Sequence, residues 1–201
     1  MRLSVFPLPG AILFPGLQLP LHIFEPRYRA MVSDAMARDR RIGMIQPREL
    51  EGDQPALFDI GCVGRIAEVE AMPDGRYNVV LEGQSLFRIT RELDVTTLFR
   101  QVEAELVAIP ADEALASIER AALEQEARRF ADTLGYAVEW DAVARLDDET
   151  LVNGIAQIAP FDVAAKQALL EAPDLSTRAD LAIQLMQFFG RHDGEDRVTL
   201  Q

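Results

Sequence analysis

Two different hydrophobic periods divide the chain near Pro110. Before this proline, short apolar or alternating runs are separated by Pro, Gly and Asp, which is typical of β-strands joined by turns. After it, apolar residues recur every three or four positions, which is typical of amphipathic helices. The pattern therefore predicts an α+β chain with a strand-rich domain at residues 1–109 and a helical domain at residues 110–201.

Short strands are expected along most of the first domain. They are residues 3–8, 17–24, 41–47, 61–72, 76–83, 85–93 and 99–107. Prolines inside the first two favour edge strands or bulges, and Asp74 with Gly75 suits a tight turn between two of the others. Six or seven short strands with one helix among them favour a small barrel or sandwich, because closing a sheet removes its exposed edges.

One helix is expected in the first domain and four in the second. Proline is favoured at the first helical position, and Glu25 puts negative charge at the positive end of the helix dipole, so a helix should begin at Pro26. The other expected helices are 111–134, 147–158, 162–172 and 176–189. Gly190 is expected to end the last helix, and a polar tail follows it.

Composition narrows the classes of partner. The chain has 33 acidic and 20 basic residues and a net charge of -13. A surface that binds phosphates needs the opposite charge balance, so nucleic acid is an unlikely partner and no membrane partner is expected.

The sequence also lacks the pattern of a membrane helix. Prolines interrupt the apolar N-terminal run, and no stretch approaches the roughly 20 apolar residues of a membrane helix. A single cysteine, Cys62, cannot form an internal disulfide, and we expect a cytoplasmic protein.

Few side chains are suited to catalysis or cofactor binding. The only lysine, Lys166, is followed by Gln167, so the chain has no Gly-Lys-Ser/Thr phosphate loop, and we expect Lys166 to be an exposed helical residue. His22 and His192 are the only histidines, too few for a histidine-rich metal site. Cys62 is expected to be a small buried hydrophobe. We therefore expect no cofactor, no metal and no catalytic residue.

The stretch LHIFEPRYRAM, residues 21–31, holds the densest mix of reactive side-chain types. We interpret it as a joint between a strand and a helix. Phe24 is expected to enter the core, and Glu25 is expected to accept hydrogen bonds from the first helical N–H groups. Glu25 and Arg29 also have the spacing of a favourable helical ion pair. Every residue of the stretch then has a structural role.

The same region carries a family resemblance. The segment FPLPGAILFPGLQLPLHIFEPRYRAMV resembles the opening of the Lon protease N-terminal domain family, also called the LON substrate-binding domain and related to peptidase family S16. Its most specific residues are Phe24, Glu25, Arg27 and Tyr28. IGMI, GCVGRIAEVEAMPDGRYNVVLEG and FRI fit the later strands, so the resemblance covers about residues 1–107. The helical remainder is similar to the bundle that follows in this family.

The resemblance implies a fold and a role. The implied fold is a small pseudouridine-synthase-like β-barrel with one inserted helix, followed by a C-terminal α-helical bundle. In the full protease this part helps to engage protein substrates, while separate ATPase and serine-lysine peptidase modules hydrolyse ATP and cleave the substrate. The resemblance therefore implies a non-catalytic, stand-alone protein-binding module or adaptor. Its partners would be other proteins or their unfolded, apolar segments, and the oligomeric state stays open.

Three hypotheses about function are kept open. A protein-binding module could use the proline-framed loop with Ile12, Leu13 and Phe14 if these side chains are exposed; if they are buried, its surface lies elsewhere. An RNA-binding module of the same barrel type would need a local basic patch, for which the candidates are Arg38, Arg40, Arg41 and Arg48. An enzyme with a hidden carboxylate site would show a polar pocket that holds a strongly shifted acid.

Overall fold

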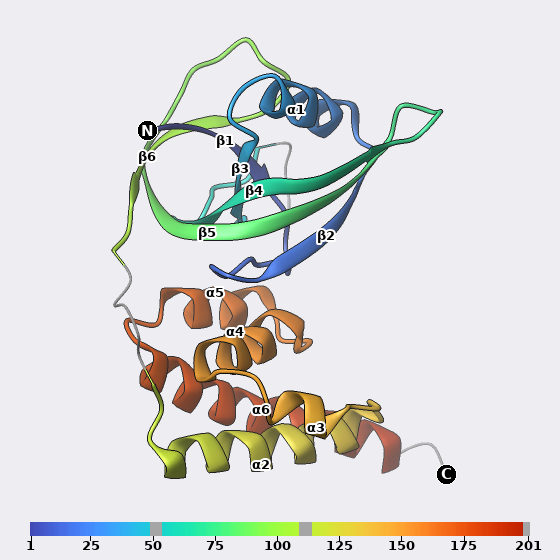
Figure 1. The fold of residues 1–201 in the computed structure, drawn as a ribbon, viewed down its shortest axis with the longest axis vertical. Helices are drawn as coiled ribbons and strands as arrows, with labels where there is room; N and C mark the ends of the chain where they lie inside the picture. The colour runs from blue at the N-terminus through green and yellow to red at the C-terminus, as the bar shows by residue number, and fades with distance from the viewer. Residues whose placement is uncertain (49–53, 109–113, 199–201) are drawn as a thin grey trace. The chain divides into compact units, whose positions relative to one another are not determined.

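The computed structural model describes residues 1–48, 54–108 and 114–198, with side chains described as far as Arg191. Two compact units make up the chain, Met1–Ile109 and Pro110–Gln201 (Figure 1). In its described part the first unit holds strands and one helix, and the second holds helices, so the protein has the expected α+β fold. None of the described helices is both long enough and apolar enough to span a bilayer.

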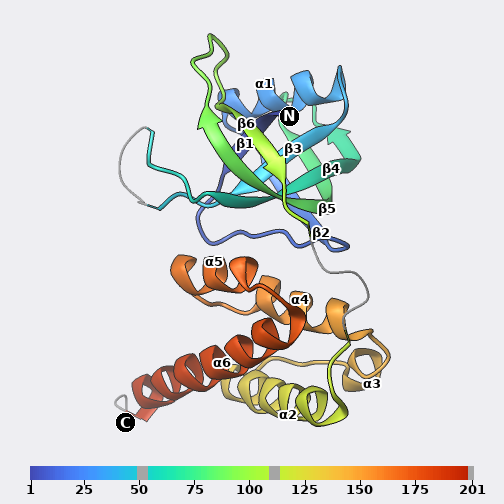
Figure 2. The same ribbon diagram turned by 90° about the vertical axis from the view of Figure 1, so that its left-hand side faces the viewer.

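The first unit is a closed barrel with one additional strand. Its elements are β1 (Arg2–Pro7), β2 (Gln18–Ile23), α1 (Pro26–Met36), β3 (Arg41–Ile45), β4 (Ile60–Ala71), β5 (Tyr77–Glu92) and β6 (Gln101–Leu106). β1 pairs with β3 in parallel, and the other pairs are antiparallel. Because β5 also pairs with β6, five strands form a ring, and β2 lies outside it on β5. α1 lies across one end of the barrel (Figure 2).

β5 joins the barrel to β2. One of its edges pairs with β4, while the other pairs first with β2 and then with β6. The sequence pattern predicts two strands here, 76–83 and 85–93, but the structure has one strand of 16 residues. At Gly83, between the two pairings, the backbone exchanges hydrogen bonds with Gly16 and Leu17, each 2.9 Å long. A distant loop therefore supplies the partners that keep the strand continuous.

The loop between β1 and β2 belongs to the core. Ile12, Leu13 and Phe14 are only 2%, 1% and 0% exposed. The structure therefore does not support them as an exposed contact surface. Their burial is favourable because each large apolar side chain contributes about 1.5 to 3 kcal/mol when it leaves water. Any binding surface of this protein must lie elsewhere.

The strand-to-helix joint differs in detail from the expectation. α1 begins at Pro26 as expected, but Glu25 makes no side-chain capping hydrogen bond, and its carboxylate instead lies 2.9 Å from Arg27 Nε. Glu is longer than the Ser, Thr, Asp and Asn side chains that favour this position. Phe24 is 61% exposed and does not enter the core. Ile23 takes the inward position, and alternation along a strand then turns its neighbour outward.

The second unit is a helical bundle in its described part. Its helices are α2 (Ser117–Leu134), α3 (Trp140–Val143), α4 (Asp148–Ile158), α5 (Val163–Glu171) and α6 (Leu175–Val198). α2, α4 and α5 all pack against α6. Part of the expected helix 111–134 lies outside the described residues, and the sequence pattern does not predict α3.

Gly190 does not end the last helix as expected. It lies within α6, where a Cβ atom would come 3.3 Å from the Phe130 ring. A glycine here allows α2 and α6 to pack closely.

A buried arginine connects three helices of this bundle. Arg178 of α6 is 7% exposed, and its Nε donates to the carbonyl oxygen of Leu169 at 2.9 Å. Its Nη1 donates to Asn153 Oδ1 of α4 at 2.9 Å, and its Nη2 to the carbonyl oxygen of Ala172 at 3.3 Å. Carbonyl groups at a helix end lack intrahelical donors. The guanidinium therefore caps the end of α5 and holds it against α4 and α6.

Lys166 is buried, which corrects the expectation of an exposed residue. It is 8% exposed, and its Nζ donates to the carbonyl oxygen of Gln157 at 3.0 Å. This oxygen belongs to the last turn of α4, where the helix dipole favours a cation. Burial lowers the pKa of the Lys166 ammonium group from its ordinary value. The turn between α4 and α5 places this lysine, and the local sequence pattern does not show such packing.

Lys166→Met is expected to make the slope of stability against pH more negative in the alkaline range. Because burial lowers this pKa in the folded state, the unfolded state binds more protons at Lys166, and the contribution of this group to the free energy of unfolding rises as pH approaches the ordinary lysine value near 10.5. The buried Cys62 thiol and Tyr28 hydroxyl, whose pKa values are raised, contribute with the opposite sign in both proteins, so the difference between the two slopes reports Lys166. Methionine has a similar length and no charge, so the rising contribution should be absent. Urea unfolding at several values between about pH 8 and pH 10 measures the slope. A Met variant with the wild-type slope would contradict the prediction.

Candidate functional site

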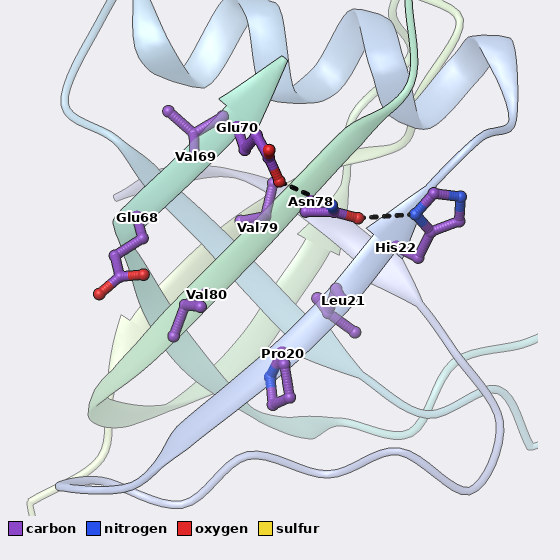
Figure 3. A pocket seen from close by; sticks show the side chains of 9 residues that line it. All are labelled: Pro20, Leu21, His22, Glu68, Val69, Glu70, Asn78, Val79 and Val80. Carbon is purple, nitrogen blue, oxygen red and sulfur yellow. Dashed lines mark hydrogen bonds between the residues drawn. The ribbon is translucent and has the colours of Figure 1, made fainter. Parts of the chain in front are cut away.

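A groove crosses the outer surface of the first unit over β2, β5 and β4 (Figure 3). Its volume is about 440 Å³. Three rows of cross-strand neighbours line it: Pro20, Val80 and Glu68; Leu21, Val79 and Val69; His22, Asn78 and Glu70. The three strands are neighbours in the sheet but lie far apart in the chain, so the groove exists only after the sheet has formed.

Strand alternation determines the character of the groove. Val79 is buried beneath it, whereas Asn78 and Val80 on either side point outward. Pro20 lies on β2, which ends the order of strands, so an edge strand is confirmed there, whereas β1 with Pro7 pairs on both sides and is not an edge. The register of β4 shifts just before Glu68, and this bulge sets which β4 side chains face the groove.

A row of hydrogen-bonded polar side chains crosses one end of the groove (Figure 3). Asn78 Nδ2 donates to Glu70 Oε2 at 2.9 Å, and Asn78 Oδ1 lies 2.8 Å from His22 Nδ1. Arg76 Nη1 lies 3.2 Å from His22 Nε2, and Arg76 also forms an ion pair with Asp74. An amide oxygen only accepts and a guanidinium only donates, so Nδ1 carries the proton and Nε2 accepts. The row therefore holds the imidazole ring in one orientation and one tautomer.

The remainder of the groove is apolar with an acidic side. Pro20 and Val80 present apolar surface in the same cross-strand row as Glu68, and both Glu68 and Glu70 are exposed. Apolar side chains provide contact area, and carboxylates accept hydrogen bonds from a bound cation. The arrangement suits the binding of a segment that carries both apolar and basic side chains.

The four signature residues have different positions. Phe24 is exposed just beyond β2, with its ring centroid 6.3 Å from that of His22, so it extends the surface beside the groove. Tyr28 is buried, and burial raises the pKa of its hydroxyl group. The Arg27 guanidinium lies 4.5 Å from the centroid of the Tyr28 ring and also pairs with Glu25. Three of the four residues thus build the joint, and Phe24 is available to a partner.

Cys62 is the buried hydrophobe that its sequence context predicts. It is 0% exposed, and burial raises the pKa of its thiol to about 12. At neutral pH the thiol therefore stays protonated and unreactive. The other histidine, His192, lies beyond the last side chain that the structure describes.

The arginines of the RNA hypothesis are partly neutralised. Arg38 pairs with Asp34 at 3.1 Å, and Arg48 pairs with Asp59 at 3.0 Å. An RNA-binding face needs cations that remain available to phosphates. These pairs and the net charge of -13 give the RNA hypothesis no support.

The described residues also give the hypothesis of a hidden carboxylate enzyme no support. Within the described ranges, no cluster of three His, Cys, Asp or Glu side chains could hold a metal ion. Hydrogen bonds from neighbouring groups lower the pKa of several surface carboxyl groups, namely Asp74, Glu103, Glu119, Asp147 and Asp174. A catalytic acid that stays protonated near neutral pH needs the opposite shift.

Comparisons with known proteins place the chain beside one family. A family model described as the ATP-dependent protease La (LON) substrate-binding domain matches residues 2–187. The Lon protease of Haemophilus influenzae is 26% identical over 192 residues, which cover 92% of this chain and 24% of that protein. Lon protease 2 of Sorangium cellulosum is 28% identical over 196 residues, with 90% and 24% covered. The chain thus spans about a quarter of the length of these relatives.

Two solved structures share the fold. One is a Lon N-terminal domain protein from Xanthomonas campestris, with a TM-score of 0.69, 21% identity, and 92% of this chain and 98% of that chain covered. The other is the N-terminal domain of the Mycobacterium avium complex Lon protease, with a TM-score of 0.68, 21% identity, and 93% and 98% covered. At this level of identity the likeness concerns the fold alone.

Proposed function

Since the chain belongs to the family of the ATP-dependent protease La (LON) substrate-binding domain, we propose that it is a non-catalytic module that binds segments of other proteins. The family model is that of a substrate-binding domain, and the similar full-length relatives are proteases, whose substrates are proteins. The chain covers about a quarter of those relatives, so the proposal concerns binding and not proteolysis.

The groove over β2, β5 and β4 is the surface that we assign to this role. The observation that carries the assignment is its composition: an apolar floor around Val80, with Glu68 beside Val80 on β4 and the polar row that ends at Glu70, also on β4, adjacent to it. Unfolded proteins expose apolar side chains next to basic ones, and such a segment would place its apolar side chains on the floor and its cation near a carboxylate. An adaptor that presents unfolded proteins to a partner would use the same contact.

Val80→Glu is expected to weaken binding of an unstructured peptide about tenfold, because it places a charge in the apolar floor of the groove. The probe is a fluorescein-labelled peptide of leucine, serine and two lysines, titrated by fluorescence anisotropy. Gln84→Glu is the matched control: Gln84 is exposed on the same strand, outside the groove, and gains the same charge. The control should bind as the wild type does.

Two outcomes would count against the proposal. If Val80→Glu binds as tightly as Gln84→Glu, with both variants folded by circular dichroism, the groove is not the binding surface. If the wild type binds neither the peptide nor a reduced and alkylated unfolded protein, a protein-binding role is itself wrong. A peptide with glutamates in place of the lysines tests the role of Glu68 and Glu70, and it should bind more weakly.

A further inference from the structure

The helical unit contains an apolar hollow that is separate from the groove of the first unit. Its volume is about 220 Å³, and residues of α2, α3, α4 and α6 line it. Phe130, Leu151 and Met186 are buried in its wall, whereas Tyr136 and Ile158 are 51% and 77% exposed at its opening. An apolar cavity of about 150 Å³ is large enough for benzene, so this hollow has room for an aromatic or branched aliphatic side chain.

The segments that line the hollow carry several acidic residues. Residues 127–159, which with Met186 hold the whole lining, contain six acidic residues and three basic ones, Arg128, Arg129 and Arg145. Two of the acids have structural roles, because Asp147 caps α4 and Asp148 pairs with Arg120. The other four are exposed: Asp132, Glu139, Asp141 and Glu149. Glu139 and Asp141 directly flank Trp140 of the lining, so the apolar opening has negative charge beside it.

We propose that this hollow binds a cationic amphipathic helix of another protein. An apolar side chain of that helix enters the hollow, and its lysines or arginines face Glu139, Asp141 and the neighbouring acids. The described part of this unit has no strand edge to pair with, so strand addition is not available, and a helix, which satisfies its own backbone hydrogen bonds, suits the site. A second copy of this chain is a poor occupant, since its net charge of -13 would meet the same acids.

Trp140 provides a direct measurement of occupancy. It lines the hollow and is the only tryptophan of the chain, with the Arg128 guanidinium 4.5 Å from its ring centroid. The probe is a tryptophan-free helix of leucine, alanine and lysine, about 18 residues or five turns long. Titration of this peptide into the full chain should change the Trp140 fluorescence in a saturable way, with an affinity that falls as salt rises. The same peptide with glutamate in place of lysine should bind at least about tenfold more weakly.

Gly154 permits a matched pair of variants. It lines the hollow in α4, and a Cβ atom there would meet nothing within 4 Å. Gly154→Leu should fill the hollow while preserving the helix, because leucine is a better helix former than glycine. We expect it to weaken binding of the lysine peptide about tenfold, whereas Gly154→Ala should change the affinity by less than about twofold.

Three peptide-binding results would overturn the proposal. They are equal affinity of the Leu and Ala variants for the lysine peptide, equal affinity of the wild type for the lysine and glutamate peptides, and a wild type whose fluorescence does not saturate with the lysine peptide. Binding to phosphatidylserine vesicles in place of the peptide would equally contradict it. Val80→Glu in the first unit should leave this titration unchanged, so the hollow and the groove are tested independently.

Discussion

Arg178→Ala is expected to lower the free energy of unfolding of the helical unit by roughly 3 kcal/mol or more. The guanidinium is buried and donates to Asn153 Oδ1 and to carbonyl oxygens of Leu169 and Ala172. Truncation removes these charge-assisted hydrogen bonds and leaves buried acceptors, each at a cost of roughly 1 to 3 kcal/mol. Because these acceptors belong to α4 and to the end of α5, the contact of both helices with α6 should loosen.

Urea unfolding followed by Trp140 fluorescence measures this effect, since the only tryptophan reports on the helical unit alone. Arg129→Ala is the control: this arginine of α2 has a side chain that is 71% exposed and only a 3.9 Å ion pair. Its change should stay below about 0.5 kcal/mol. Similar losses in the two variants would show that the buried hydrogen bonds do not hold the bundle together.

Gly83→Ala is expected to destabilise the barrel by about 3 kcal/mol or more. A Cβ atom at this position would collide with the carbonyl oxygen of Phe14, and a backbone atom cannot move aside as a flexible side chain can. Relief would require the loop to withdraw, which would break the hydrogen bonds of Gly83 with Gly16 and Leu17. It would also pull the fully buried Phe14 out of the core.

Thermal unfolding and amide hydrogen exchange together test this prediction. Exchange at residues 14–17 and within β5 should rise in Gly83→Ala, because the strand loses its loop partner. The same substitution at Gly154, where a Cβ atom meets nothing within 4 Å, should instead stabilise its helix by up to about 1 kcal/mol. Unchanged exchange at residues 14–17 would mean that the loop tolerates the added methyl group.

The sequence predicts a helix or strand well where the local pattern of apolar residues reflects which side of that element is buried. Half-buried strands alternate along the chain, and amphipathic helices repeat every three or four residues, so both can be recognised without knowledge of their neighbours. The helix start at Pro26 and the buried Cys62 were predicted on such local grounds. The sequence pattern divides β5 at Gln84, just after Gly83, because a glycine gives the same local signal near a turn and at a close approach of two backbones.

The candidate site was not predicted, and its residues show why. His22, Asn78 and Glu70 come from three strands, and only the pairing of β2 with β5 and of β5 with β4 brings them into one row. The partial signal in the sequence was the alternation in residues 76–83, which places Asn78 and Val80 on the outward face but does not identify their neighbours. The strand-to-helix pattern predicts Phe24 in the core, yet the chain turns it outward just beyond β2.

Local hydrophobic periods, composition and short motifs are enough to predict the α+β fold class, the change from strands to helices near Pro110, the acidic charge and the family resemblance. The folded structure was needed to show that Ile12, Leu13 and Phe14 lie in the core and that Lys166 and Arg178 are buried. It was also needed to reveal the groove and the apolar hollow. Burial and cavities depend on which distant segments cover a side chain, and residues far apart in the chain meet only when it folds.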